Sequence, residues 1–172
     1  ACLLLAMVAR VLGKYEEARQ YAKQGYACTV RTGDAFIQSY CLREWGMASQ
    51  LLGDLADAKS RVEASYAIQE SLKDRRGMAI TLANLGRIAL HEGENAKARR
   101  CYEQALTICH DLGDDVSLAT ALEGMGNSAR AMGHYGESRR YLREALQISR
   151  DRMLPSVLSI FVGIGELFLQ TG

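Results

Sequence analysis

The chain has 172 residues, of which 48% are hydrophobic, and it carries 21 Lys and Arg against 20 Asp and Glu. This apolar content excludes an intrinsically disordered chain, and a net charge of +1 gives no general attraction to nucleic acid or to anionic membranes. The five cysteines include no CxxC pair and form neither a disulfide nor a zinc framework, so we expect reduced thiols in a cytoplasmic protein.

The predicted elements are helices arranged in units that repeat every 40 residues. Glycine, small, apolar and acidic residues all keep this period, so chance is not a serious explanation. The units are expected at about 1–33, 34–73, 74–113 and 114–153, followed by a half unit at 154–172. The periodic positions are Gly13, Gly53, Gly93 and Gly133; Gly46, Gly86 and Gly126; Ala18, Ala58, Ala98 and Ser138; and Asp34, Asp74 and Asp114.

The third unit shows how each repeat divides into two helices. Apolar residues recur at steps of three and four from Arg76 to Leu90, and again from Ala98 to Ile108, which predicts two amphipathic helices. Gly93 ends the first of them in a left-handed backbone conformation. Asp114 then stands at the N-cap of the next helix, where its carboxylate accepts a backbone hydrogen bond.

Glycines within the predicted helices indicate close packing between neighbouring helices. Gly46 and its periodic equivalents cost about 1 kcal/mol each relative to alanine, so we expect another helix backbone to pass close by. Trp45 lies on the apolar stripe of its helix, and we expect it in the core.

One recurring pattern resembles that of the tetratricopeptide repeat family. It consists of a Leu-Gly pair, a glycine seven residues after it, a small residue five residues later, and an aromatic or apolar residue four residues after that. In the third unit these residues are Leu85, Gly86, Gly93, Ala98, Tyr102 and Ala105. The resemblance implies an all-α fold, a right-handed α-solenoid of antiparallel helical hairpins that forms one domain over 1–172. The period of 40 is similar to that of sensor arrays in bacterial signal-transduction ATPases and transcription activators, and to that of spindle-orientation adaptors.

The resemblance also implies a concave groove, lined by the first helix of each hairpin, that binds an extended peptide. We expect Arg43, Arg87 and Arg130 to bind carboxylates of the peptide, and Asn84 to bind its backbone, as does Asn127. The alternative is that these side chains are solvated or pair between repeats. The predicted groove residues are Tyr40, Arg43, Met47, Gln50, Asn84, Arg87, His91, Glu123, Asn127 and Arg130.

Several other functions lack the residues that they need. A clamp for chaperone tails requires lysines and asparagines where this chain has Leu3, Arg43, Ala83 and Glu123. No phosphate-binding loop, nucleophile elbow or paired-carboxylate cleft is present, so we expect neither an enzyme nor a cofactor. Cys109 has no ligand-forming neighbour at helical spacing, which argues against a metal site.

The arginines of the second helices do not predict nucleic-acid binding. Arg99, Arg139 and their neighbours alternate with Glu103 and Glu137 at helical spacing, which favours ion pairs within each helix. No apolar run approaches the roughly 20 residues that cross a bilayer, so we expect no membrane partner.

The function predicted from the sequence is a protein- or peptide-binding scaffold, the sensor or assembly segment of a multidomain bacterial signalling or transcriptional regulator. The alternatives are a stand-alone adaptor that bridges two proteins and a cytoplasmic receptor for a short signalling peptide. We expect the chain to be a piece of a longer protein. We also expect it to self-associate through the apolar helix at 156–169, or through Leu3 to Val8.

Overall fold

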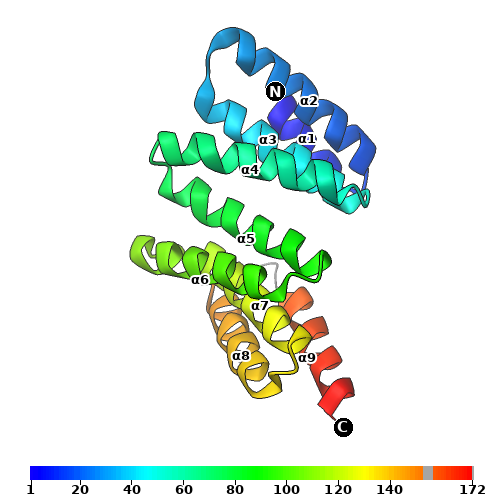
Figure 1. Cartoon of the computed structure of the whole chain (residues 1–172), viewed down its shortest axis with the longest axis vertical. Helices are drawn as coiled ribbons and strands as arrows, with labels where there is room; N and C mark the ends of the chain where they lie inside the picture. The colour runs from blue at the N-terminus through cyan, green and yellow to red at the C-terminus, as the bar shows by residue number, and fades with distance from the viewer. Residues whose placement is uncertain (153–156, 172) are drawn as a thin grey trace. The chain divides into compact units, whose positions relative to one another are not determined.

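In this computed structural model residues 1–152 and 157–171 are described, and every regular element among them is an α-helix, which confirms the all-α prediction. They form two compact units, Ala1–Ile88 and Ala89–Gly172 (Figure 1), while the single domain over 1–172 stays a prediction. None of the described helices is both long enough and apolar enough to span a membrane. The helices are α1 (Cys2–Val11), α2 (Tyr15–Thr32), α3 (Ala35–Leu51), α4 (Leu55–Ser71), α5 (Arg75–His91), α6 (Asn95–Leu112), α7 (Asp115–Ala131), α8 (Tyr135–Asp151) and α9 (Val157–Thr171).

Short turns join the helices into hairpins, and both predicted turn signals are confirmed. α3 packs against α4 in the first unit and α7 packs against α8 in the second (Figure 1). Gly53, between α3 and α4, has a φ of 86°, the left-handed conformation that residues with a Cβ rarely adopt. The carboxylate of Asp34 caps α3 by accepting the N–H of Ile37 at 3.0 Å, and that of Asp114 caps α7 by accepting the N–H of Ser117 at 3.2 Å.

In the first unit α4 lies so close to α3 that only glycine fits at position 46. A Cβ at Gly46 would stand 2.5 Å from Val62 Cγ2 and 2.9 Å from the carbonyl oxygen of Ala58. Ala58 and Val62 are fully buried and pack with Ile88 of α5. The expectation that the mid-helix glycines admit a neighbouring helix is confirmed here.

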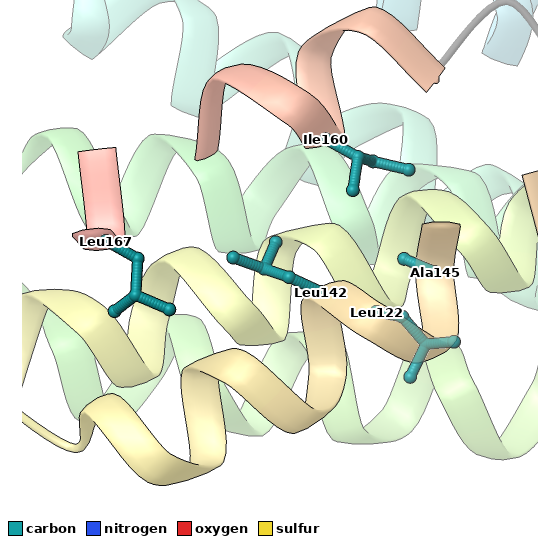
Figure 2. Packing of buried hydrophobic residues seen from close by; sticks show 5 residues of the cluster. All are labelled: Leu122, Leu142, Ala145, Ile160 and Leu167. Atoms are coloured by element: carbon teal, nitrogen blue, oxygen red, sulfur yellow. The ribbon is translucent and has the colours of Figure 1, made fainter. Parts of the chain in front are cut away.

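The second unit has an apolar core formed by α7, α8 and α9. Figure 2 shows its five buried side chains, with Leu142 and Ala145 on α8 and the others on the helices beside it. Gly126 of α7 lies against α8, since a Cβ there would stand 2.7 Å from Leu142 Cγ. The five residues are Leu122, Leu142, Ala145, Ile160 and Leu167.

Trp45 is only half-buried, which corrects the expectation that it belongs to the core. Its Nε1–H donates to Asp57 Oδ2 at 2.8 Å, and the cations of Lys23 and Arg61 lie 5.0 and 4.1 Å from its ring centroid. The indole N–H needs a polar partner, and cations are attracted to the ring face, so the side chain stays at the edge of the hairpin.

Candidate functional site

The predicted groove residues fall into two groups, one in each compact unit. In the first unit they lie on α3 and α5, and in the second on the end of α5 and on α7. The first group is Tyr40, Arg43, Met47, Gln50, Asn84 and Arg87, and the second is His91, Glu123, Asn127 and Arg130.

Arg43 is the least expected member of the first group because it is a buried cation, only 6% exposed. Its guanidinium lies 4.5 Å from the centroid of the Tyr40 ring, and Nη2 lies 3.6 Å from Glu44 Oε1. Nε and Nη1 are buried and have no hydrogen-bond partner among the described residues. Donors left in this state cost about 1–3 kcal/mol each, so Arg43 retains capacity for an acceptor.

Arg87 links the two helices of this face. Its Nε donates to Gln50 Oε1 on α3 at 3.0 Å, and its Nη2 donates to Asn84 Oδ1 one turn earlier on α5, also at 3.0 Å. Asn84 is 6% exposed, and its Nδ2 is buried with no hydrogen-bond partner in the described part of the chain. For Arg87 the pairing between repeats, considered above as the alternative, is therefore present.

Tyr40 covers Arg43 and is itself held in place by α5. Its hydroxyl donates to Asp74 Oδ2 at 3.1 Å, while Asp74 Oδ1 caps α5 by accepting the N–H of Gly77 at 2.9 Å. Burial, together with the negative charge of Asp74, raises the pKa of Tyr40 above its usual value. Tyr40 thus stays neutral at physiological pH and acts as a hydrogen-bond donor.

An ion pair on the same face was not predicted. Arg10 of α1 donates through Nε to Glu44 Oε2 of α3 at 2.9 Å, and Glu44 is only 2% exposed. The repeat contained the signal, because Glu44 lies one period of 40 residues before Asn84. Applying the reasoning for Asn84 one unit earlier would have placed Glu44 on this face. We call Arg10, Tyr40, Arg43, Glu44, Gln50, Asn84 and Arg87 the polar face.

In the second unit the predicted residues are engaged differently. Arg130 of α7 forms an ion pair with Glu166 of α9, with Nη2 and Oε2 2.7 Å apart. Glu123 accepts the hydroxyl of Ser159 at 3.2 Å. Asn127 is half-buried and His91 is exposed. Arg130 thus has a carboxylate partner, while its Nε is buried with no hydrogen-bond partner among the described residues, and the expectation that it binds a carboxylate of a ligand stays a prediction.

A second polar cluster lies between α3 and α4 and holds the hairpin together. Asp57 Oδ2 accepts from Trp45 and also from Ser49 at 2.7 Å, and Oδ1 accepts from Arg61 Nε at 2.9 Å. Burial opposes ionisation of Asp57, but the hydrogen bonds from Ser49, Arg61 and Trp45 outweigh it and hold its pKa below the usual value.

The arginines of the second helices form ion pairs both within and between helices. Arg99 Nε lies 3.0 Å from Glu103 Oε1 within α6, as predicted. Arg99 Nη1 also lies 3.0 Å from Glu137 Oε2 of α8, a pairing between hairpins that the spacing within one helix did not predict.

Comparisons with known proteins identify the repeat. A family model described as tetratricopeptide repeat matches residues 34–111 and 77–151. No curated protein sequence matches the chain. The matching residues include most of the chain, from the cap of α3 to the end of α8.

Solved structures of low sequence identity share the fold. Aspartyl phosphate phosphatase F from Bacillus subtilis aligns with a TM-score of 0.81 at 17% identity, over 99% of this chain and 49% of that chain. BtubC from P. vanneervenii aligns with a TM-score of 0.75 at 18% identity, over 88% of this chain and 63% of that chain. A STAND protein with a tetratricopeptide repeat sensor from Pyrococcus horikoshii aligns with a TM-score of 0.74 at 16% identity, over 94% of this chain and 25% of that chain. The chain thus spans less than two thirds of each of these proteins, and the likeness confirms the predicted all-α repeat fold of helical hairpins.

Proposed function

Because this chain belongs to the tetratricopeptide repeat family of protein-interaction scaffolds, we propose that it binds an extended segment of a partner protein along its polar face. The observation that carries the proposal is Arg43, a buried arginine whose Nε and Nη1 have no hydrogen-bond partner among the described residues. A carboxylate of the ligand supplies the missing acceptors, because guanidinium and carboxylate groups match in geometry and charge.

Asn84 supplies the second contact of this proposal. Its Oδ1 is held by Arg87, which orients the amide and leaves the buried Nδ2 as a donor for a peptide carbonyl. A side-chain amide fixed in this way recognises backbone rather than a particular residue. Arg43 then favours an acidic residue in the ligand, and Asn84 favours an extended chain.

Access to Arg43 requires the Tyr40 side chain to move. The ring lies over the guanidinium at 4.5 Å, and the hydroxyl bond to Asp74 keeps it there. Binding of an acidic ligand therefore exchanges the contact with Tyr40 for an ion pair in a site that is largely shielded from water, where such pairs are stronger than at the surface.

Within a larger protein, we place this module as the sensor or assembly segment of a bacterial signalling or transcriptional regulator. The fold likeness to the tetratricopeptide repeat sensor of the STAND protein is compatible with that role. The alternatives, an adaptor that bridges two proteins or a receptor for a signalling peptide, use the same polar face and predict the same local contacts.

The test begins with a displayed library of random peptides selected against the intact chain, followed by anisotropy titration of the enriched sequences. We expect acidic residues to be enriched, and Arg43→Gln and Asn84→Ala each to weaken binding about tenfold, the loss expected for a buried charged or amide contact. Arg31→Gln is the matched control, since Arg31 is an exposed arginine on α2, the second helix of its hairpin.

Circular dichroism and thermal melts of each variant separate loss of binding from loss of fold. Arg43→Lys, which keeps the charge but not the fork of donors, should bind with intermediate affinity. Selected peptides whose affinity is unchanged in both Arg43→Gln and Asn84→Ala would contradict the proposal.

A further inference from the structure

Gln69 of α4 is a buried amide that the proposed function does not use. Its side chain is fully enclosed, yet neither Nε2 nor Oε1 has a hydrogen-bond partner among the described residues. Such an amide bears the cost of leaving water without the gain of a hydrogen bond. A buried group of this kind calls for an explanation, and a second conformation of the chain in which its donor is used supplies one.

The packing of the repeat does not require an amide at this position. Its equivalents at intervals of 40 residues are smaller and also buried: Thr29, Cys109 and Ser149. The hydroxyl of Thr29 donates to the carbonyl oxygen of Tyr26 in its own helix at 2.8 Å. The longer side chain of Gln69 extends away from α4, toward the start of α5.

There the amide lies beside Asp74, the residue that holds Tyr40 in place. The N–H of Asp74 donates to the carbonyl oxygen of Gln69 at 2.9 Å across the turn between the two helices. A Cβ at Gly77 would overlap Asp74 Oδ2 and would stand 3.0 Å from Gln69 Cδ. Both groups therefore lie against the same glycine, which has no side chain to separate them.

Asp74 obtains its second hydrogen bond differently from the equivalent cap of α7. There Oδ2 of Asp114 accepts the hydroxyl of Ser117, three residues along, at 3.0 Å. Gly77 is the counterpart of Ser117 and has no hydroxyl. In α5 the oxygen instead accepts the hydroxyl of Tyr40, which lies on another helix and can move away independently of α5.

Movement of Tyr40 takes this donor from Asp74 Oδ2. A carboxylate oxygen that loses its partner on the protein side raises the free energy of the open conformation. Gln69 has an unused donor next to that oxygen. Rotation about the last bond of its side chain turns Nε2 toward Asp74 without moving Cδ, and this torsion is a soft one.

We propose that Gln69 is a positioning residue for the opening of the polar face. When Tyr40 leaves Asp74, the Gln69 amide donates to Asp74 Oδ2 and stabilises the open conformation. The inference rests on the proposed function, in which an acidic ligand at Arg43 displaces Tyr40. The cost of the buried amide is thus present only while Tyr40 covers Arg43, which narrows the free-energy gap between the closed and open conformations.

The first experiment measures the opening of Tyr40 in the intact chain without a ligand. Tetranitromethane attacks the tyrosine phenolate, which Tyr40 forms only after its hydroxyl leaves Asp74, and mass spectrometry of tryptic peptides gives the nitration rate. Gln69→Met keeps the volume but removes the amide, so nitration of Tyr40 should slow about fivefold. Nitration of the exposed Tyr135 on α8 should stay unchanged. A merely structural role for Gln69 predicts the opposite sign, because a loosened fold exposes Tyr40 more.

The second experiment is a double-mutant cycle measured by urea unfolding. Tyr40→Phe removes the donor to Asp74, and the equilibrium constant for unfolding should rise about threefold in the parent chain but about thirtyfold in Gln69→Met, where no amide replaces it. Gln69→Met alone should change this constant by less than about twofold, or favour the folded state, because the amide has no bond to lose. Ser138→Ala is the matched control. It removes another fully buried group without a hydrogen-bond partner in the described part of the chain, and it should leave the effect of Tyr40→Phe unchanged.

Unchanged or faster nitration of Tyr40 in Gln69→Met, or additive effects of the two substitutions, would overturn the proposal. A marked loss of stability in Gln69→Met alone would overturn it too, since the amide would then already be bonded, to a buried water. Neither measurement uses a ligand, so failure to select acidic peptides contradicts the proposed function alone. Selected peptides should bind Gln69→Met about fivefold more weakly than the parent chain; equal affinity contradicts the role of Gln69 and leaves the proposed function in place.

Discussion

The two units use the same repeat but are held together by different interactions. In the first, charged and amide side chains link successive first helices, as in the ion pair of Arg10 with Glu44 and the hydrogen bond of Arg87 to Gln50. In the second, a continuous apolar cluster around Leu142 joins three helices (Figure 2). Hydrogen bonds are directional and apolar contacts are not, so the links between first helices in the first unit depend more strictly on side-chain geometry than the apolar cluster of the second unit does.

The largest effect is expected from Leu142→Ala in the apolar cluster. Leu142 is fully buried, and its removal leaves a cavity between α7 and α9, so we expect the second unit to lose about 3–4 kcal/mol of stability. Amide hydrogen exchange measured helix by helix gives the local stability of each unit. Protection should fall in α7 and α8 and remain in α2 and α3; equal loss in both units would show that the contrast between them is wrong.

Glu44→Gln tests the polar side of the comparison. The substitution keeps the shape of the side chain but removes its charge, so Arg10 and the buried Arg43 lose their carboxylate partner. We expect a loss of about 2–3 kcal/mol, within the range for hydrogen bonds to charged groups and below that for a fully buried pair. Denaturant unfolding measures the loss, and Glu17→Gln, which changes an exposed pair with Lys14, should cost less than about 0.5 kcal/mol.

Acid should affect the first unit through the cluster around Asp57. Its folded-state pKa lies below the ordinary value of 3.8, so the stability it contributes is present above about pH 4 and is lost as the pH falls through the lower, folded pKa. The fluorescence of Trp45, the one tryptophan of the chain, reports on this hairpin, because its Nε1–H donates to Asp57. Urea midpoints should fall in the acid range, and Asp57→Asn should flatten that dependence while lowering stability at neutral pH by about 1 kcal/mol. If the Asp57→Asn variant keeps the acid dependence of stability that the parent chain shows, that dependence arises from a group other than Asp57.

The helices, turns and close packing could be predicted because they depend on local, repeated signals. The backbone favours one residue type at each of three positions: Gly53 at a turn, Asp34 at a helix cap and Gly46 between two packed helices. Because the pattern repeats every 40 residues, the same residue type recurs at the equivalent position of successive units, and a single sequence contains several copies of the same signal.

The site could be predicted only in part, because side-chain pairing depends on neighbours that the repeat does not fix. Arg43 and Arg130 are both arginines on first helices, yet Glu166 neutralises Arg130, whereas Arg43 meets Tyr40 and Glu44. The period assigns them to different positions, Arg43 with Ala83 and Glu123 and Arg130 with Gln50 and Leu90, but it fixes the partner of neither. The prediction that Trp45 lies in the core was wrong for a similar reason. Its position in the apolar stripe of α3 indicates burial, but its hydrogen-bond partner, Asp57, lies on the next helix.

The smallest expected effect concerns the turn after α4, where the first unit departs from the glycine pattern. Lys73 has a φ of 55°, the left-handed conformation that Gly33 and Gly113 adopt at the equivalent turns. A residue with a Cβ is strained there by about 1 kcal/mol, part of which the greater flexibility of glycine in the unfolded chain offsets. Lys73→Gly should therefore stabilise the first unit by about 0.5 kcal/mol, seen as stronger amide protection in α4, while Gly113→Lys should destabilise the second unit by about 1 kcal/mol. If Lys73→Gly lowers stability instead, the lysine side chain contributes more to the turn than its backbone strain costs.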